Sequence, residues 1–471
     1  MTATTTETGS WRELLGRYLG ASVVLAGGVG LYATNEFLTV SLLPSAIVEI
    51  GGNRLYAWVV TLYLVGSVVA ATTVNSVLVR FGARNSFLLG LAVFGVASLV
   101  CAAAPSMEVL IAGRTLQGVA GGLLAGLGYA LINSALPRSL WTRGSALVSA
   151  MWGVATVVGP AIGGVFAQFG LWRWAFGSMA ILTALMSILV PTVLAASRDG
   201  AGGETPATPA LKVPVWSLLL MGASALAVSV AQLPHRVLAT TGLLGAGVLL
   251  VAVFMVVDRR SRAAVLPLSV FGSGPLKWVY LTMALQMMAV MVDTYVPLFG
   301  KQLGHLNPVL AGFLGAALAV GWTVSEMVSA SLNNSRLIGY VVLTAPLVMA
   351  AGLAVGALTQ RADASIGVIV LWAAALLVAG IGIGMAWPHL AVRAMECVDD
   401  PAEGGAAAAA INIVQLISAA FGAGLAGVVV NLADGADLLA AQWLFTVFTL
   451  LAAVGFIASY RATRGDRRSP R

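Results

Sequence analysis

The stretch VLIAGRTLQGVAGGLLAGLGYAL, from Val109 to Leu131, carries a single charged residue, Arg114, in an otherwise uncharged and largely apolar run. A helix needs about 20 predominantly apolar residues to cross a bilayer, and this run has that length. A charge inside a bilayer is costly, so where one occurs it marks function by default. The stretch therefore predicts a membrane-spanning helix with a base buried inside it.

The composition of the whole chain agrees with a membrane location. Of its 471 residues, 59% are hydrophobic and 9% are charged, whereas soluble domains carry about 25% charged residues. This composition excludes a secreted enzyme, a nucleic-acid-binding domain and a disordered chain. The net charge of +7 is explained by basic residues in cytoplasmic loops, so we expect no nucleic-acid partner.

Fourteen stretches are apolar and long enough to be predicted spans, with a polar break after the sixth. They are 18–43, 57–79, 87–104, 109–131, 145–168, 174–196, 215–233, 237–257, 276–299, 309–330, 340–358, 367–389, 406–431 and 438–458. The break, SRDGAGGETPATPALKVP, is rich in Gly, Pro and Thr, as linkers are. The layout indicates a duplicated six-helix unit with a hairpin inserted between the copies.

The predicted organisation is all-α. In order, it comprises a cytoplasmic tail, a six-helix bundle, a linker, an inserted transmembrane hairpin, a second linker, a second six-helix bundle and a basic cytoplasmic tail. Their bounds are 1–17, 18–196, 197–214, 215–257, 258–275, 276–459 and 460–471.

The basic residues test this topology. With both termini inside the cell, nineteen of the 25 lie inside, one lies within a span, and five lie outside (Arg54, Arg173, Arg236, Lys301 and Arg361). This bias follows the positive-inside rule and predicts a multi-pass protein of the cell (inner or plasma) membrane with cytoplasmic termini. A twelve-span alternative, in which 215–257 lies on the membrane, places the ends on the same sides.

Four ionisable residues fall inside predicted spans: Glu36, Arg114, Asp293 and Glu326. At a rise of about 1.5 Å per residue, the first three lie at or above the membrane midplane and Glu326 lies nearer the inner side. We predict that these four residues form a site that binds and releases protons, with Arg114 pairing with Glu36 or Asp293. The alternative is a static ion pair that fixes helix packing.

Polar neighbours extend this candidate site. Tyr32, Glu36 and Thr39 follow i, i+4, i+7 spacing and share a helix face. The predicted substrate-binding residues are Tyr32, Thr39, Tyr63, Gln286, Trp152, Asn412 and Gln415. The alternative for the amides is a packing hydrogen bond between helices.

Two glycine-rich segments, LIAGRTLQGVAGG (110–122) and GVATVVGPAIGG (153–164), resemble motif B and the antiporter motif C of the Major Facilitator Superfamily, in particular of its drug:proton antiporters. GLWRWAF (170–176) matches the usual signature of the following turn, and NEFLTVSLLP (35–44) resembles the first span of twelve-span drug and sugar exporters. The inserted hairpin is typical of the fourteen-span branch.

The resemblance implies which residues gate the transporter. They are Arg80, Gly82, Arg84, Gln117, Gly159, Pro160, Gly163 and Gly164. The motif around Arg80 departs from the family pattern, because Val79 replaces its acid and Asn75 replaces its first glycine. The family uses that acid to latch the cytoplasmic gate, so the departure puts the latch in doubt.

The resemblance implies alternating-access export of a small amphiphilic compound in exchange for protons. The protein would need no cofactor beyond the proton gradient and no metal, it would not be an enzyme, and its partners would be substrate, protons and lipid, in a monomer. Two alternatives remain: export of a sugar, amino acid or other metabolite, and a membrane sensor or scaffold that does not transport.

Overall fold

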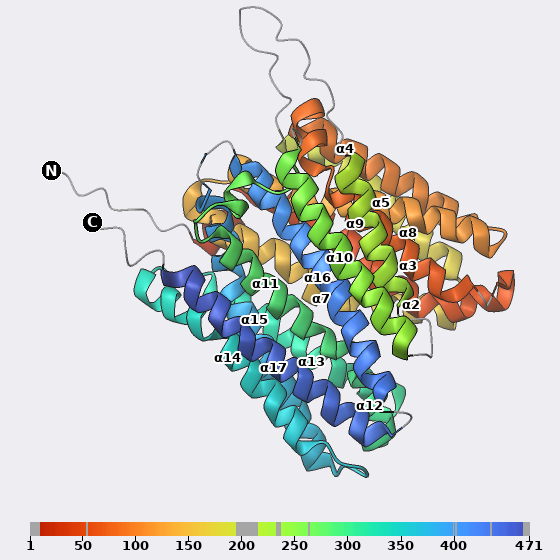
Figure 1. The fold of residues 1–471 in the computed structure, drawn as a ribbon. Helices are drawn as coiled ribbons and strands as arrows, with labels where there is room; N and C mark the ends of the chain where they lie inside the picture. Colours follow the sequence, from red (N-terminus) through yellow and green to blue (C-terminus); the bar gives the residue numbers. More distant parts are fainter. Residues whose placement is uncertain are drawn as a thin grey trace, which may run out of the picture. The chain divides into compact units, whose positions relative to one another are not determined.

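The computed structural model describes residues 10–52, 55–194, 215–231, 237–261, 264–398, 400, 403–433 and 436–464. Within these residues the chain is helical and forms no strand (Figure 1). The first half holds α1 Trp11–Leu14, α2 Leu19–Ile50, α3 Tyr56–Ala71, α4 Val74–Ala102, α5 Met107–Ala130, α6 Ile132–Ala135, η2 Arg138–Leu140, α7 Trp141–Gln168 and α8 Trp172–Val193. The remainder holds α9 Val215–Val230, α10 Val237–Arg260, η3 Leu268–Phe271, α11 Leu276–Val290, η4 Met291–Tyr295, α12 Val296–Gly304, α13 Pro308–Ser329, α14 Ser335–Thr359, α15 Ile366–Glu396, α16 Gly404–Leu432 and α17 Asp437–Arg464.

Each of the fourteen predicted stretches overlaps a helix, although 57–79 is divided between α3 and α4, and 276–299 between α11, η4 and α12. By length and composition, twelve helices in the described part of the chain can cross a membrane, and α3 and α9 are shorter apolar helices. Apolar runs become helices because a bilayer core offers the backbone no water, so every N–H and C=O must be bonded within the segment. The predicted linker at 197–214 and the turn at 234–236 lie outside the described residues.

The region between the second and third predicted spans differs most from the structure. The second span was expected to continue to residue 79, but α3 ends at Ala71. The hydroxyls of Thr72 and Thr73 bond the carbonyl oxygens three residues back, at 2.7 Å each, and the helix resumes as α4. A second interruption falls at Gly82, whose φ of 72° is left-handed and separates the second predicted span from the third.

The chain divides into two compact units. The N-terminal unit comprises 1–222, 253–268 and 400–413, and the C-terminal unit comprises 223–252, 269–399 and 414–471. In the N-terminal unit α5 packs against α2, α3 and α4, and α8 packs against α2 and α4. In the C-terminal unit α15 packs against α11, α13 and α14, and α17 packs against α11 and α14.

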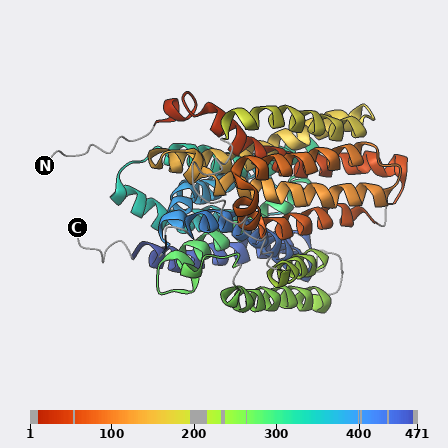
Figure 2. The same cartoon turned by 90° about the horizontal axis from the view of Figure 1, so that it is seen from above.

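These pairings correspond when the helices are numbered by span within each half. The first, second and third spans pack on the fourth, and the first and third pack on the sixth, in both units. The inserted helices α9 and α10 run beside each other, with the Ser224 hydroxyl donating to the Gly247 carbonyl at 3.0 Å (Figure 2).

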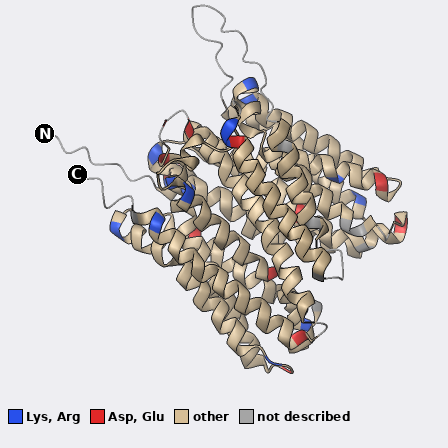
Figure 3. Cartoon of the chain, in the orientation of Figure 1, with Lys and Arg blue, Asp and Glu red and all other residues tan. Residues whose placement is uncertain are grey.

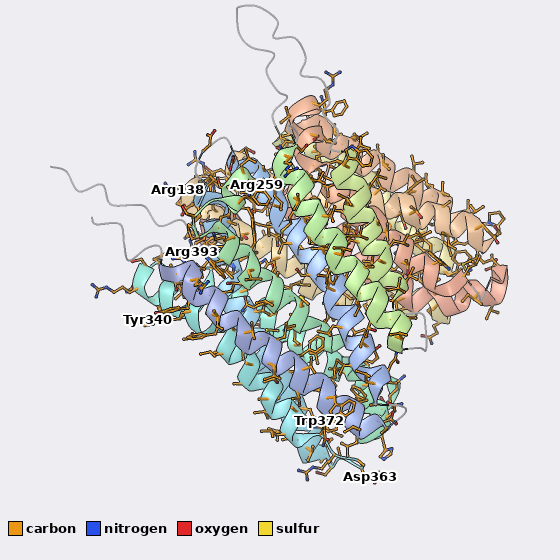
Figure 4. The ribbon with its side chains drawn as sticks, in the orientation of Figure 1. Arg138, Arg259, Tyr340, Asp363, Trp372 and Arg393 are labelled. Atoms are coloured by element: carbon orange, nitrogen blue, oxygen red, sulfur yellow. The ribbon has the colours of Figure 1, made fainter. Side chains whose placement is uncertain are left out.

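Charged residues are sparse along the helices and gather at their ends (Figure 3). In the C-terminal unit, Tyr340 and Arg393 lie at one end of the antiparallel pair α14 and α15, and Asp363 and Trp372 lie at the other (Figure 4). The few charged residues that lie within the helices are therefore candidates for a functional role.

Candidate functional site

Three aromatic rings from different helices meet in the N-terminal unit. Tyr32 on α2 stacks on Tyr63 of α3 with ring centroids 5.4 Å apart and planes 9° apart. Trp152 of α7 meets the Tyr32 ring edge-on, also at 5.4 Å. The Tyr63 hydroxyl donates to the Tyr32 carbonyl oxygen at 2.8 Å, and the Tyr32 hydroxyl donates to Ser67 Oγ at 3.2 Å. The structure thus brings together the three predicted aromatic residues of this unit.

Arg114 lies against this aromatic cluster. Its guanidinium carbon is 3.9 Å from the Tyr63 ring centroid, the geometry of a cation–π contact. Its Nη1 donates to Gln117 Oε1 at 2.9 Å, and Gln117 Nε2 donates to Ser98 Oγ at 2.8 Å. Arg114 is 1% exposed, so these contacts replace water around a buried charge. Gln117 therefore positions the arginine from one turn further along the same helix.

Glu36 belongs to the same neighbourhood but does not bond Arg114 directly. Tyr32, one helical turn before Glu36 on α2, stacks on the Tyr63 ring that faces Arg114, yet no ion pair within 4.0 Å joins Glu36 to Arg114 among the described residues. The predicted pairing with Glu36 is thus an interaction between neighbours and not a contact. Thr39, on the same face, donates its hydroxyl to the Asn35 carbonyl of its own helix at 2.7 Å.

The neighbourhood holds several buried polar atoms that have no hydrogen-bond partner in the described part of the chain. Leaving a donor or acceptor unmet costs about 1–3 kcal/mol, so such atoms gather where a ligand or water is to be bound. Asn412 adds a nearby donor, because its Nδ2 reaches the Gly122 carbonyl at 3.4 Å. The unmet atoms are Asn35 Oδ1 and Nδ2, Glu36 Oε2, Arg114 Nε, Trp152 Nε1 and Asn412 Oδ1.

Glycines of α5 permit this assembly. A Cβ at Gly118 would collide with the Tyr63 backbone, one at Gly122 with the Ser67 backbone, and one at Gly121 with the Tyr32 ring. Small residues allow such close helix approach inside membranes. The glycines of motif B therefore bring α2 and α3 up to the helix that carries Arg114.

The motif C glycines seat α7 on α2, within the N-terminal unit. A Cβ at Gly159 would lie 2.7 Å from Phe37 Cβ, and one at Gly163 would lie 2.7 Å from the Leu38 carbonyl oxygen. Gly164 has nothing within 4 Å, and Pro160 is exposed. Two of the four predicted gating residues in this motif, Gly159 and Gly163, thus pack against α2 beside Phe37 and Leu38, the two residues that follow Glu36.

The turn around Gly82 keeps its left-handed backbone. Ser86 Oγ donates to the Gly82 carbonyl at 2.6 Å and lies 3.1 Å from the Val77 carbonyl. Val79, where the family has an acid, is 62% exposed. Arg80 and Arg84 flank the same turn and are partly exposed. The Ser86 hydroxyl therefore supports this left-handed turn, and sequence reasoning missed that residue.

The C-terminal unit places Asp293 in a break. The predicted single span at 276–299 is divided by the 3₁₀ segment η4, which contains Asp293. Asp293 Oδ1 has no hydrogen-bond partner in the described part of the chain. A Cβ at Gly315 of α13 would lie 3.7 Å from this oxygen. Discontinuous helices with exposed backbone are typical of transporter binding sites.

Other predicted residues of this unit are buried but lie on different helices. Glu326 on α13 is fully buried, and Gln286 on α11 reaches the Gly382 carbonyl at 3.5 Å. Gln415 on α16 is 1% exposed, and its amide has no hydrogen-bond partner among the residues that the structure describes.

Two further carboxylates, not expected from the sequence, organise helix ends. Asp258, fully buried at the end of α10, accepts hydrogen bonds from the Ser217 hydroxyl and from the backbone N–H groups of Val265 and Leu266, at 2.9–3.1 Å. Glu49 accepts from Trp172 Nε1 at 2.6 Å and pairs with Arg173. In the sequence, a polar residue at the edge of an apolar run indicates where a helix ends, but it does not indicate which residues the polar group will bond.

The repeated helix packing and the buried polar cluster define a membrane transporter rather than an enzyme. The chain belongs to the Major Facilitator Superfamily, whose sequence profile matches residues 25–423.

Relatives and solved structures agree with this assignment. The chain is 74% identical, over all 471 residues of both proteins, to a probable multidrug-efflux transporter of Mycobacterium tuberculosis. It is 23% identical over 402 residues to the multidrug transporter MdtP of Bacillus subtilis, covering 83% of this chain and 72% of that protein. The fold is similar to that of the human organic anion transporter MFSD10, with a TM-score of 0.68 at 16% identity, covering 94% of this chain and 99% of that one.

Proposed function

We propose that the protein exports small amphiphilic compounds in exchange for protons, by alternating access. The observation that carries the proposal is the cluster in the N-terminal unit. There, Glu36 lies beside three aromatic rings and Arg114, with buried polar atoms left unmet. An apolar wall with a few polar groups is the usual form of a small-molecule site. The names of the efflux relatives support the direction of transport.

In this proposal Glu36 and Asp293 carry the protons. An ionisable residue buried in a membrane marks a proton or substrate pathway by default. Arg114 tunes the charge near Glu36 while Gln117 and Tyr63 hold it, so its part is electrostatic and structural. Glu326 is a further candidate because it is fully buried on α13.

We further propose fourteen spans, with α9 and α10 as a transmembrane hairpin inserted between two copies of a six-helix unit. The matching helix pairings of the two units support the duplication. The gathering of basic residues at helix ends supports cytoplasmic termini in the cell membrane. We also propose that the protein works as a monomer.

The test is transport by purified protein in proteoliposomes with an imposed pH gradient. We expect Glu36→Gln and Asp293→Asn to lose gradient-driven efflux of amphiphilic compounds. Glu108→Gln, which removes an exposed carboxylate at the start of α5, should keep it. Wild-type coupling in both site variants would end the proposal, and a compound panel that includes sugars and amino acids separates drug export from metabolite export.

A sensor or scaffold role is the second candidate, and Val79 at the position of the family's acid favours it. Glu36, Arg114 and Asp293 within the predicted spans oppose it, because a scaffold gains nothing from the cost of ionisable residues inside a membrane. Absence of transport across the whole panel by correctly folded wild-type protein would favour the scaffold.

A further inference from the structure

A groove on the N-terminal unit lies apart from the polar cluster. It has a volume of about 420 Å³ and is formed by α2, α7 and α8. Its lining is apolar except for Thr34. The residues that decide its shape are Gly27, Gly30, Thr34, Ile162, Met179 and Met186.

Two glycines of α2 line the groove. The Met186 methyl packs over Gly27, where a Cβ would collide with it. At Gly30 the nearest atom to such a Cβ is Met151 Sδ, at 3.5 Å, which is an ordinary van der Waals contact, so a side chain can be added there. Methionine side chains adapt to the shape of an apolar partner. The groove is therefore apolar and adjustable.

The groove lies on the back of the helix that carries the site. Gly27, Gly30 and Thr34 follow i, i+3, i+7 spacing and share one face of α2. Tyr32 and Glu36 are each two residues from Thr34, which is about 200° around a helix of 3.6 residues per turn. A molecule in the groove would thus contact α2 opposite the polar cluster.

The dimensions and rim of the groove fit one kind of occupant. From Val23 to Thr34 it follows α2 for about 16 Å, at about 1.5 Å per residue. That is half of a hydrocarbon core of about 30 Å, the depth of one leaflet. The rim residues Leu182 and Leu185 are 46% and 59% exposed, so the groove opens to the hydrocarbon around the helices.

The start of α2 carries the residues expected at a membrane surface. The Arg17 guanidinium lies 5.7 Å from the Tyr18 ring centroid, just before the helix begins. Basic and aromatic residues anchor helix ends at headgroup level. We propose that the groove binds one acyl chain of a membrane phospholipid, in the leaflet on the side where α2 begins. The bound chain would brace α2 against α7 and α8 behind Glu36.

Photolabelling tests this proposal on the full-length protein. The probe is a phosphatidylglycerol with a diazirine at the end of one acyl chain, in vesicles that contain the reconstituted protein. We expect labelling at Met179–Leu189 to exceed labelling of the exposed face of α10. Gly30→Leu should reduce it about tenfold, the change that displacing two buried methylene groups produces.

Gly245→Leu is the matched control, because nothing lies within 4 Å of a Cβ there on α10. It should leave the α8 labelling unchanged. Melting temperatures of both variants near that of wild type establish that they are folded, and Gly27→Leu provides a second filled groove if Gly30→Leu does not fold. Equal labelling of α8 and α10 would overturn the proposal, as would unchanged labelling of the variant whose groove is filled. Loss of labelling when an exported amphiphile is present during irradiation would also overturn it. The result does not depend on proton coupling.

Discussion

Replacing Gly118 by alanine should destabilise the N-terminal unit, and the structure gives the size of the effect. The added Cβ would overlap the carbonyl oxygen of Tyr63 and would lie 2.8 Å from its carbonyl carbon and 2.9 Å from its Cα, where ordinary contacts begin at 3.4 Å. All three obstacles are backbone atoms, so α3 must move away from α5 by roughly 1 Å. Overpacking of this kind costs about 1–3 kcal/mol.

The assay is a thermal unfolding scan of purified protein in detergent. For a folding unit of about 250 residues, such as the N-terminal unit, 1 kcal/mol shifts Tm by about 2–4 °C, so Gly118→Ala should lower Tm by about 2–12 °C. Movement of Tyr63 also withdraws the ring that faces Arg114, so substrate affinity should fall with it.

Gly245→Ala provides the control for Gly118→Ala. Its Cβ meets nothing within 4 Å, so the helix should gain about 0.5–1 kcal/mol from reduced backbone freedom. If Gly118→Ala and Gly245→Ala have the same Tm, at or above the Tm of wild type, the close contact of α3 and α5 described above is wrong.

Three further variants test the ends of the helices. Asp258→Asn places an NH₂ group among three donors and should cost about 1.5–3 kcal/mol, seen as faster tryptic cleavage after α10; unchanged cleavage would contradict the hydrogen bonds described. Glu49→Gln should change Tm by less than about 2 °C, since its partner Arg173 is exposed enough for water to screen the ion pair. A larger decrease in Tm would show that this ion pair contributes substantially to stability. Ser86→Ala should lower the free energy of unfolding by about 1 kcal/mol, measured as a decrease in Tm, because the hydroxyl supports the Gly82 turn. An unchanged Tm would show that other contacts hold the turn.

Most helix positions could be predicted from the sequence, because a bilayer leaves an apolar run of sufficient length no other structure. The breaks at Thr72 and at Asp293 could not, since each depends on local hydrogen bonds or on a 3₁₀ turn inside a run that stays apolar. The composition of an apolar run does not indicate where its backbone leaves the α-helical conformation.

The candidate site was predicted in part. Helical spacing identified the shared face of Tyr32 and Glu36, and the aromatic partners Tyr63 and Trp152 proved to be neighbours. The contacts of Arg114 were not foreseen, because a charge in an apolar run suggests a carboxylate partner, whereas the structure supplies a ring and an amide. Such a contact depends on three helices meeting, which spacing within one helix does not encode.

Proton release on substrate addition tests the central claim most directly. Purified protein in weakly buffered detergent solution, mixed with amphiphilic compounds, should release protons that a pH dye detects. The account predicts that this release is strongly reduced in Glu36→Gln and preserved in Glu108→Gln. Release equal to that of wild type from the combined Glu36→Gln and Asp293→Asn variant would contradict it.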